Sequence, residues 1–142
     1  MIRPLAPADR PAWEPLWRDY LAFYGTTLPP EVYDAQWQRL MTGHPVAGLI
    51  AEKDGLAIGI THFIFHSHGW KTRDVCYLQD LYVTPDARGT GAGRALIEGV
   101  YAAADANGTP DVYWLTAQDN APGRRLYDRV GSLTPFIKYA RP

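Results

Sequence analysis

Three glycines at alternating positions have the spacing in this chain that most directly indicates a ligand. Gly89, Gly91 and Gly93 follow an apolar run and a proline turn, and a helical pattern begins after them. A turn of this kind between a strand and a helix leaves backbone N–H groups unpaired at the positive end of the helix, where they can hold phosphate oxygens. The segment 88–94 is therefore predicted to be a phosphate-binding loop.

The glycine spacing separates several kinds of phosphate-binding loop. A P-loop ends in Gly-Lys-Ser/Thr, whereas this chain has Gly93-Arg94-Ala95. The dinucleotide-binding fingerprint Gly-x-Gly-x-x-Gly is a poor match, because the glycines here are two and two apart. The loop alone is also compatible with a plain turn that binds no ligand. The residues around the loop are therefore needed to distinguish these alternatives.

The wider context resembles the Gcn5-related N-acetyltransferase (GNAT) family. Residues 88–93 have the form Arg/Gln-x-x-Gly-x-Gly/Ala of the family's acetyl-CoA signature, after a strand that ends in Val-x-Pro. Residues 120–131 are similar to the family helix Asn-x-x-Ala-x-x-Leu-Tyr-x-x-x-Gly, with Gly123 where alanine is usual, a departure expected to loosen that turn. The segments 77–83 and 136–139 are similar to the polyamine and histone acetyltransferase branch.

This resemblance implies both a fold and an activity. The fold is of the mixed α/β class: a central, mostly antiparallel sheet with helices on both faces and a splayed parallel strand pair. The activity is acetyl transfer from acetyl-CoA to a primary amine (a small amine, a polyamine or lysine) by direct attack on the thioester, within one domain over residues 1–142. The alternative is a non-catalytic acyl-CoA-binding or sensor domain of the same fold.

The resemblance also assigns site residues. It places these residues at the cofactor: Leu81, Tyr82, Val83, Arg88, Gly89, Thr90, Gly91, Ala92, Gly93, Arg94, Asn120 and Tyr127. The main chain of Leu81 and Val83 would bind pantetheine and the thioester carbonyl, and an N–H there would stabilise an oxyanion. Tyr127 would protonate the departing thiolate, so Tyr127 and Leu81 are the predicted catalytic residues. Asn120 would cap its helix or bind pantetheine, and Arg124 or Arg125 would reach the 3′-phosphate.

The sequence does not identify the group that removes the proton from the amine. The polyamine branch often has a glutamate where this chain has Gln79, and glutamine cannot take up a proton. Asp80 is adjacent but is expected to point to the opposite face of its strand. Water-mediated removal is one alternative, and the others are Glu31, Asp34, His62, His66 and Tyr24. No metal site is expected, because His66 and His68 lack further ligands at metal-binding spacing, and Cys76 is expected to pack in a strand.

Hydrophobic periodicity predicts the elements that position these residues. Strands are expected over 2–5, 48–52, 56–66, 75–84, 111–117 and 136–140. Helices are expected over 10–24, 31–41, 91–107 and from Asp119 or Asn120 to Val130, with Asp9 as the N-cap of the first. The crossover from Tyr77 to Leu115 predicts a parallel pair, and the preceding hairpins predict antiparallel ones.

Composition bounds the partners. The chain has 142 residues, is 46% hydrophobic and 20% charged, and carries a net charge of −1, which argues against a nucleic-acid binder. No apolar run approaches the length of a membrane span, and a single cysteine fits a reducing cytoplasm.

The two N-terminal helices and residues 68–71 are expected to form the amine pocket. A homodimer through the C-terminal strand is a family-level expectation. The residues expected to line the amine pocket are Trp13, Trp17, Tyr24, Trp37 and Trp70.

Overall fold

The computed structural model describes all residues from 1 to 142. In chain order the elements are β1 (Ile2–Pro4), η1 (Pro7–Asp9), α1 (Arg10–Phe23), α2 (Pro30–Thr42), β2 (Val46–Lys53), β3 (Leu56–His66), β4 (Val75–Val83), η2 (Pro85–Ala87), α3 (Ala92–Ala106), β5 (Val112–Tyr113) and α4 (Ala121–Val130). No helix is long and apolar enough to cross a membrane.

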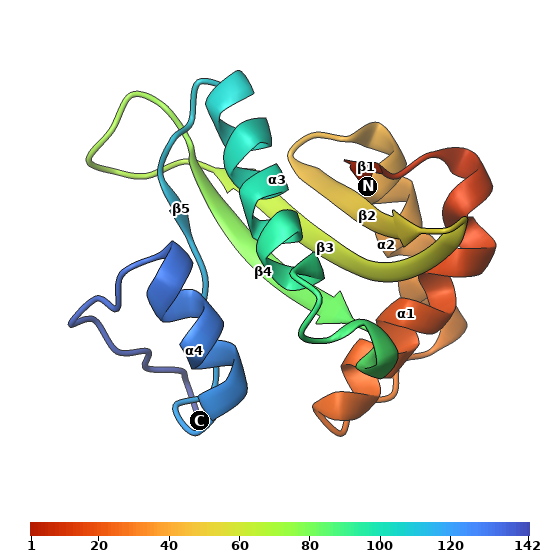
Figure 1. Ribbon diagram of the computed structural model, residues 1–142. Coiled ribbons are helices and arrows are strands. Elements are labelled where there is room, and N and C mark those ends of the chain that lie inside the picture. The colour runs from red at the N-terminus through yellow and green to blue at the C-terminus, as the bar shows by residue number, and fades with distance from the viewer.

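The five strands form one mixed sheet in the order β1-β2-β3-β4-β5. The first three pairings are antiparallel, and β4 pairs with β5 in parallel. Only two residue pairs join β4 to β5, Cys76 with Val112 and Tyr77 with Tyr113, after which the chain leaves the sheet (Figure 1). The predicted fold with its splayed parallel pair is confirmed, and the strand expected over 111–117 is shorter because it leaves the ladder.

Helix α3 covers one face of the sheet. Its residues Leu96, Ile97 and Val100 are completely buried, because their spacing places them on one side of the helix. They pack with residues of β2, β3 and β4 in a cluster that α4 joins through Leu126 and Tyr127. Burial of each such aliphatic side chain contributes about 1.5–3 kcal/mol, so this cluster fixes α3 and the loop before it against β4.

Helices α1 and α2 cover the opposite face (Figure 1). Trp13 and Trp17 of α1 are buried and stack with ring centroids 5.3 Å apart, as their shared helix face predicts. Tyr24 was expected on the same helix, but α1 ends at Phe23 and Tyr24 is half exposed. The two layers of helices therefore leave the C-terminal end of α1 close to the end of β4.

A β-bulge interrupts the ladder between β3 and β4. His62 pairs with Asp80, and Phe63 pairs with Leu78, so Gln79 has no partner. An unbroken strand would turn Leu78 and Asp80 to the same face. With the extra residue, Leu78 packs in the α3 cluster whereas Asp80 contacts Trp17 of α1.

Two features near the chain ends differ from expectation. Asp9 occupies the N-cap position of α1, as predicted, but its side chain makes no capping hydrogen bond. Its carboxylate instead accepts the Ala6 N–H (2.7 Å) and pairs with Arg3 (2.7 Å), whose guanidinium holds the pKa of Asp9 below its usual range. Residues 136–140 form no strand, and Phe136 and Tyr139 are 83% and 90% exposed. A strand needs a neighbour to bond, and the short β5 offers this segment none.

Candidate active site

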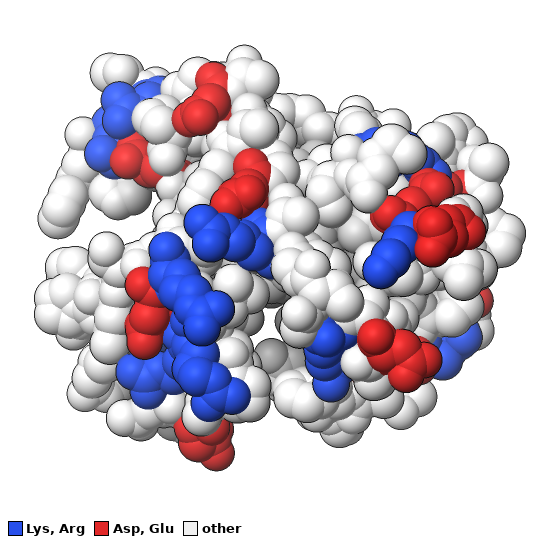
Figure 2. Space-filling view, in the orientation of Figure 1, with Lys and Arg blue, Asp and Glu red and all other residues white.

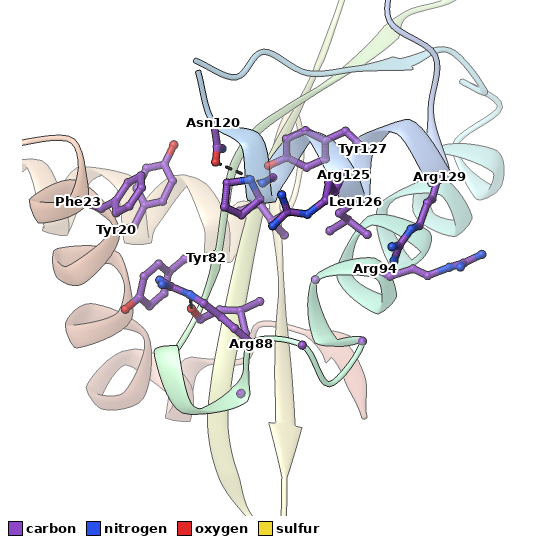
Figure 3. A pocket seen from close by; sticks show the side chains of 18 of the residues that line it. Tyr20, Phe23, Tyr82, Arg88, Arg94, Asn120, Arg125, Leu126, Tyr127 and Arg129 are labelled. Carbon is purple, nitrogen blue, oxygen red and sulfur yellow. Dashed lines mark hydrogen bonds between the residues drawn. The ribbon is translucent and has the colours of Figure 1, made fainter. Parts of the chain in front are cut away.

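A cavity of about 580 Å³ lies between the end of β4, the glycine loop, α4 and the C-terminal end of α1 (Figure 3). Figure 2 shows the corresponding hollow, with Lys and Arg side chains gathered beside it. Four arginines line the cavity: Arg88, Arg94, Arg125 and Arg129. The cavity thus combines a strand edge, a glycine turn and positive charge, which suits an elongated anionic ligand.

The end of β4 presents free backbone groups to this cavity. The N–H of Thr84 donates to Ile58 on the β3 side (2.9 Å), so backbone alternation turns the main-chain groups of Leu81 and Val83 to the other side. There β5 has already left the sheet, and the Val83 carbonyl instead accepts a hydrogen bond from Arg88 Nε (3.1 Å). Leu81, Tyr82 and Val83 all line the cavity, as predicted.

The glycine loop lies at the opposite wall. Gly89 and Gly91 have φ values of +79° and +89°, a left-handed conformation that side chains disfavour, and no protein atom lies within 4 Å of where a Cβ would be. Helix α3 starts at Ala92 without a side-chain cap, which leaves its first N–H groups for a ligand. Gly89, Gly91 and Gly93 line the cavity, whereas Thr90 and Ala92 do not. The Thr90 hydroxyl donates to the carbonyl of Ala87.

The arginines differ in how they are held. Arg88 bonds the Val83 carbonyl and lies over the Tyr82 ring (5.8 Å), and Arg94 pairs with Glu98 (2.8 Å). Arg125 and Arg129 face the cavity and take part in no ion pair. Arg124, the alternative considered from the sequence, bonds the Gln118 carbonyl (2.8 Å) and does not line the cavity.

Arg129 was not predicted from the sequence, although a signal for it exists. It lies four residues after Arg125, so the two share one face of a helix. Once Arg125 is a candidate phosphate ligand, the helical spacing makes Arg129 a second one.

Asn120 and Gly123 form the start of α4 together. The Asn120 side chain accepts the Gly123 N–H (3.2 Å) and donates to Thr116 (3.0 Å), so the expected helix cap is present. A Cβ on Gly123 would lie only 2.4 Å from Asn120 Nδ2. Glycine therefore makes room for the capping side chain, and the expectation that it loosens the turn is wrong.

Tyr127 reaches the cavity from α4. Its ring packs edge-on against Trp114, with centroids 5.7 Å apart, and burial raises the pKa of its phenol. A smaller void of about 20 Å³ adjoins the cavity and shares four lining residues with it, Tyr20, Tyr24, Leu81 and Tyr127. These residues mark the junction of the two spaces, where β4 and the three tyrosines line both.

The candidate proton acceptors lie in different places. Asp34 pairs with Arg10 (2.8 Å), His66 bonds the Tyr113 hydroxyl (2.8 Å), and neither they nor Glu31 line either space. His62 is completely buried beneath α1, and among the candidates only Tyr24 lines the cavity. Cys76 is also buried, and burial raises the pKa of its thiol to about 11, so it offers no thiolate at neutral pH.

The expected amine pocket is corrected in part. None of Trp13, Trp17, Trp37 and Trp70 lines the cavity, nor does the segment 68–71. The two indoles of α1 are core residues, and Trp70 is 89% exposed on the β3–β4 connection. Helix α1 contributes its C-terminal end instead, through Tyr20 and Phe23, with Tyr24 directly after it.

Comparison with known proteins agrees with this geometry. The model of the Acetyltransferase (GNAT) family matches residues 13–131. The chain is 39% identical to the D-amino-acid N-acetyltransferase HPA3 of Saccharomyces cerevisiae over 144 residues, covering 99% of this chain and 89% of that protein. It is 30% identical to the uncharacterized N-acetyltransferase YhfO of Bacillus subtilis, covering 97% of this chain and 94% of that protein.

Solved structures share the fold. The structure of AAC(6')-Iy in complex with the bisubstrate analog CoA-S-monomethyl-acetylneamine matches with a TM-score of 0.88 at 20% identity, covering 100% of this chain and 97% of that one. At this identity the likeness shows the fold alone. With the family match over most of the chain, however, the conclusion is direct: this chain belongs to the GNAT family and is an acetyl-CoA-dependent N-acetyltransferase.

Proposed function

We propose that this enzyme transfers the acetyl group of acetyl-CoA to the primary amine of a small, amino-acid-like acceptor by direct attack on the thioester. The observation that carries the proposal is the junction of the two cavities, where the free β4 edge at Leu81 meets the phenols of Tyr20 and Tyr127. The acceptor class follows from the relative that is 39% identical and is named for acetylation of D-amino acids.

The cavity fits acetyl-CoA by the chemistry of its walls. The main chain of Leu81 and Val83 is a strand edge that an amide-containing pantetheine arm can bond, with Tyr82 between them. The N–H groups from Gly89 to Arg94, which include those of Thr90 and Ala92, would bind the pyrophosphate at the start of α3. The N–H of Arg88 donates to the Pro85 carbonyl instead (3.3 Å), so Arg88 would contribute through its side chain. Arg125 and Arg129 are free to bind a further phosphate, and Asn120 holds the turn that places them.

The reaction forms a C–N bond and breaks a C–S bond. Bound acetyl-CoA supplies an activated acetyl group. A backbone N–H at Leu81 would stabilise negative charge on the carbonyl oxygen. Tyr127 donates a proton to the departing sulfur, and its raised pKa keeps the phenol protonated at neutral pH.

The second candidate is a domain that binds acetyl-CoA without catalysis. Its motivation is Gln79, an exposed residue at the β-bulge that cannot accept a proton. A binding domain has no need of a phenol at the junction, so the position of Tyr127 favours the enzyme.

The acceptor is tested with a panel of amines. Release of free thiol from acetyl-CoA is measured with D- and L-amino acids, an aminoglycoside, polyamines and lysine peptides; polyamines and lysine are included because residues 77–83 resemble that branch. We expect the highest kcat/KM with amino acids. Higher values for polyamines or lysine peptides would overturn the acceptor class, and binding without release for every amine would favour the sensor.

We also propose that residues 1–142 act as one domain and that the chain forms a homodimer through its C-terminal segment. Both helical layers pack on one sheet, which supports a single domain. Four large apolar side chains of the segment after α4 are exposed, Leu133, Phe136, Ile137 and Tyr139. Analytical ultracentrifugation tests the dimer; a monomer at micromolar concentration would contradict it.

A further inference from the structure

A buried chain of hydrogen bonds lies beneath α1 and has no part in the reaction described so far. Trp13 Nε1 donates to His62 Nε2 (2.9 Å), and His62 Nδ1 bonds Asp80 Oδ2 (2.8 Å). Trp17 Nε1 donates to the same carboxylate oxygen (3.3 Å). His62 is 0% exposed and Asp80 is 8% exposed. The β-bulge at Gln79 is what turns Asp80 toward these partners.

The hydrogen bonds determine which nitrogen of His62 carries the hydrogen. An indole N–H can only donate, so His62 Nε2 is the unprotonated nitrogen of the imidazole. The neutral ring then carries its hydrogen on Nδ1 and donates it to Asp80 Oδ2, which also accepts from Trp17. His62 has no lone pair left for a substrate. Two donors thus converge on one oxygen of Asp80, and His62 itself is no base.

Asp80 is connected to the active site through Tyr20. Asp80 lines neither cavity, whereas Tyr20 lines both. Tyr20 lies one turn after Trp17 on the same face of α1 and packs against the aromatic cluster that contains Trp17, whose indole bonds Asp80. Burial, followed by the charge of Asp80 and a side-chain hydrogen bond to Asp80, raises the pKa of the Tyr20 phenol. In Figure 3, Tyr20 from α1 and Tyr127 from α4 lie on opposite sides of the cavity.

We propose, on the basis of the proposed function, that Tyr20 and Asp80 form the proton-accepting arm of the reaction. The Tyr20 oxygen takes a proton from the acceptor ammonium while the Tyr20 hydroxyl passes its own proton to Asp80. The amine so formed attacks the thioester. Tyr20 is then a catalytic residue, and His62 and Trp17 are positioning residues that hold the Asp80 carboxyl group toward Tyr20.

The protons balance in this scheme. An ammonium acceptor loses two protons on its way to an amide. The first passes through Tyr20 to Asp80 and, after the product has left, returns through Tyr20 to the water of the cavity; the second replaces the proton that Tyr127 gives to the sulfur. The titratable groups that face Asp80 are Tyr20 from α1, His62 from β3 and Tyr77 from β4; burial and the charge of Asp80 also raise the pKa of Tyr77.

The test compares Tyr20→Phe and Asp80→Asn with the wild type over a range of pH. Two acceptors are used, a D-amino acid and its amide, whose amine is less basic. We expect Tyr20→Phe to lower kcat/KM for the amino acid by about 10²-fold near neutral pH, which is typical for loss of general base catalysis. The deficit shrinks as pH rises through the amine pKa and is smaller for the amide, because a free amine needs no relay. Asp80→Asn follows the same trend.

A matched control separates the relay from packing. Tyr33→Phe removes a phenol oxygen from the same aromatic cluster; the centroids of the Tyr33 and Trp17 rings are 5.1 Å apart, but Tyr33 does not line the cavity. The kcat/KM of Tyr33→Phe relative to that of the wild type is expected not to change with pH. If Asp80→Asn does not fold, Tyr20→Phe decides alone, because phenylalanine keeps the ring. The relay is overturned if the wild type is active and Tyr20→Phe loses no kcat/KM, or loses the same amount at every pH and with both acceptors. If the wild type is inactive with every amine, the proposed function is overturned as well.

Discussion

Tyr20 and Tyr127 line the same cavity in different surroundings. Tyr127 packs against the Trp114 ring, and burial is the main cause of its raised pKa. Tyr20 lies against the carboxylate of Asp80, whose charge adds to the effect of burial. A phenol without a neighbouring anion keeps its proton until a stronger base forms, and a phenol beside an anion can pass its proton on. The two residues are therefore suited to opposite ends of the reaction.

Replacement of Tyr127 by phenylalanine tests the acid role. We expect kcat to fall by about 10–10²-fold while the KM for acetyl-CoA changes by less than about threefold, because only the departing sulfur needs the proton. The raised pKa also places the alkaline loss of wild-type kcat above about pH 10, the ordinary phenol value, and the variant should lack that limb. Steady-state kinetics over pH measure both effects, with Tyr139→Phe in the exposed tail as control. Unchanged kcat would remove Tyr127 from this role.

At this scale the sequence predicted residues that act through a motif and missed those that depend on pairing. Asn120, Tyr127 and the three glycines were found because their spacing along the chain is itself the signal. The orientation of Asp80 depends on a bulge, which appears only when β4 is laid against β3. Tyr20 lies within the helix predicted over 10–24, but its contact with Asp80 joins residues sixty positions apart in the chain.

At the scale of elements, the glycine loop can be tested apart from helix stability. Gly91→Ala and Gly108→Ala each place a side chain at positive φ with open space around it, so both should lose about 1–2 kcal/mol of unfolding free energy. Gly91 lines the cavity and Gly108 does not. Only Gly91→Ala should therefore weaken acetyl-CoA binding, by about tenfold, equivalent to about 1.4 kcal/mol. Titration calorimetry measures the binding; equal affinities of the two variants would contradict a phosphate-binding role for the loop.

At the start of α4, the effect of Gly123→Ala on the unfolding free energy should change sign when the Asn120 side chain is removed. Asn120→Ala loses the helix cap and about 1 kcal/mol of unfolding free energy. Gly123→Ala alone displaces the Asn120 side chain and should cost a similar amount. In the Asn120→Ala background the steric conflict is gone, and Gly123→Ala should stabilise by up to about 1 kcal/mol, because alanine favours helix. Urea unfolding of the four proteins measures this cycle, and a destabilising effect in both backgrounds would refute it.

Most elements were predictable because their hydrophobic periodicity reports one buried face. The helices and the first four strands lie close to the expected ranges. The exceptions are at the edge of the sheet. Residues 136–140 were expected to form a strand but find no partner, and β5 keeps only two pairs because it diverges from β4. Periodicity indicates that a segment can form a strand, and it does not indicate what the segment pairs with.

At the scale of the whole molecule, the cavity joins elements from both helical layers. Tyr20 comes from the α1 layer, and Arg125 and Tyr127 come from α4 on the other side. A ligand in this cavity should therefore stabilise the native state as a unit. Acetyl-CoA at about 100 times its Kd should add about 2.7 kcal/mol and raise Tm by several degrees, while NAD and ATP should not. Differential scanning calorimetry measures the shift; an equal shift with ATP would indicate a generic nucleotide site.

The central claim is that the acetyl group passes from acetyl-CoA to an amine directly within this cavity. The most direct measurement is mass spectrometry of a reaction with isotope-labelled acetyl-CoA and a D-amino acid, which follows amide, coenzyme A and intact protein together. We predict labelled amide and coenzyme A in equal amounts, with the protein mass unchanged throughout. Bound acetyl-CoA that yields no amide, or an acetylated protein that forms and then passes its label to the amine, would contradict the account.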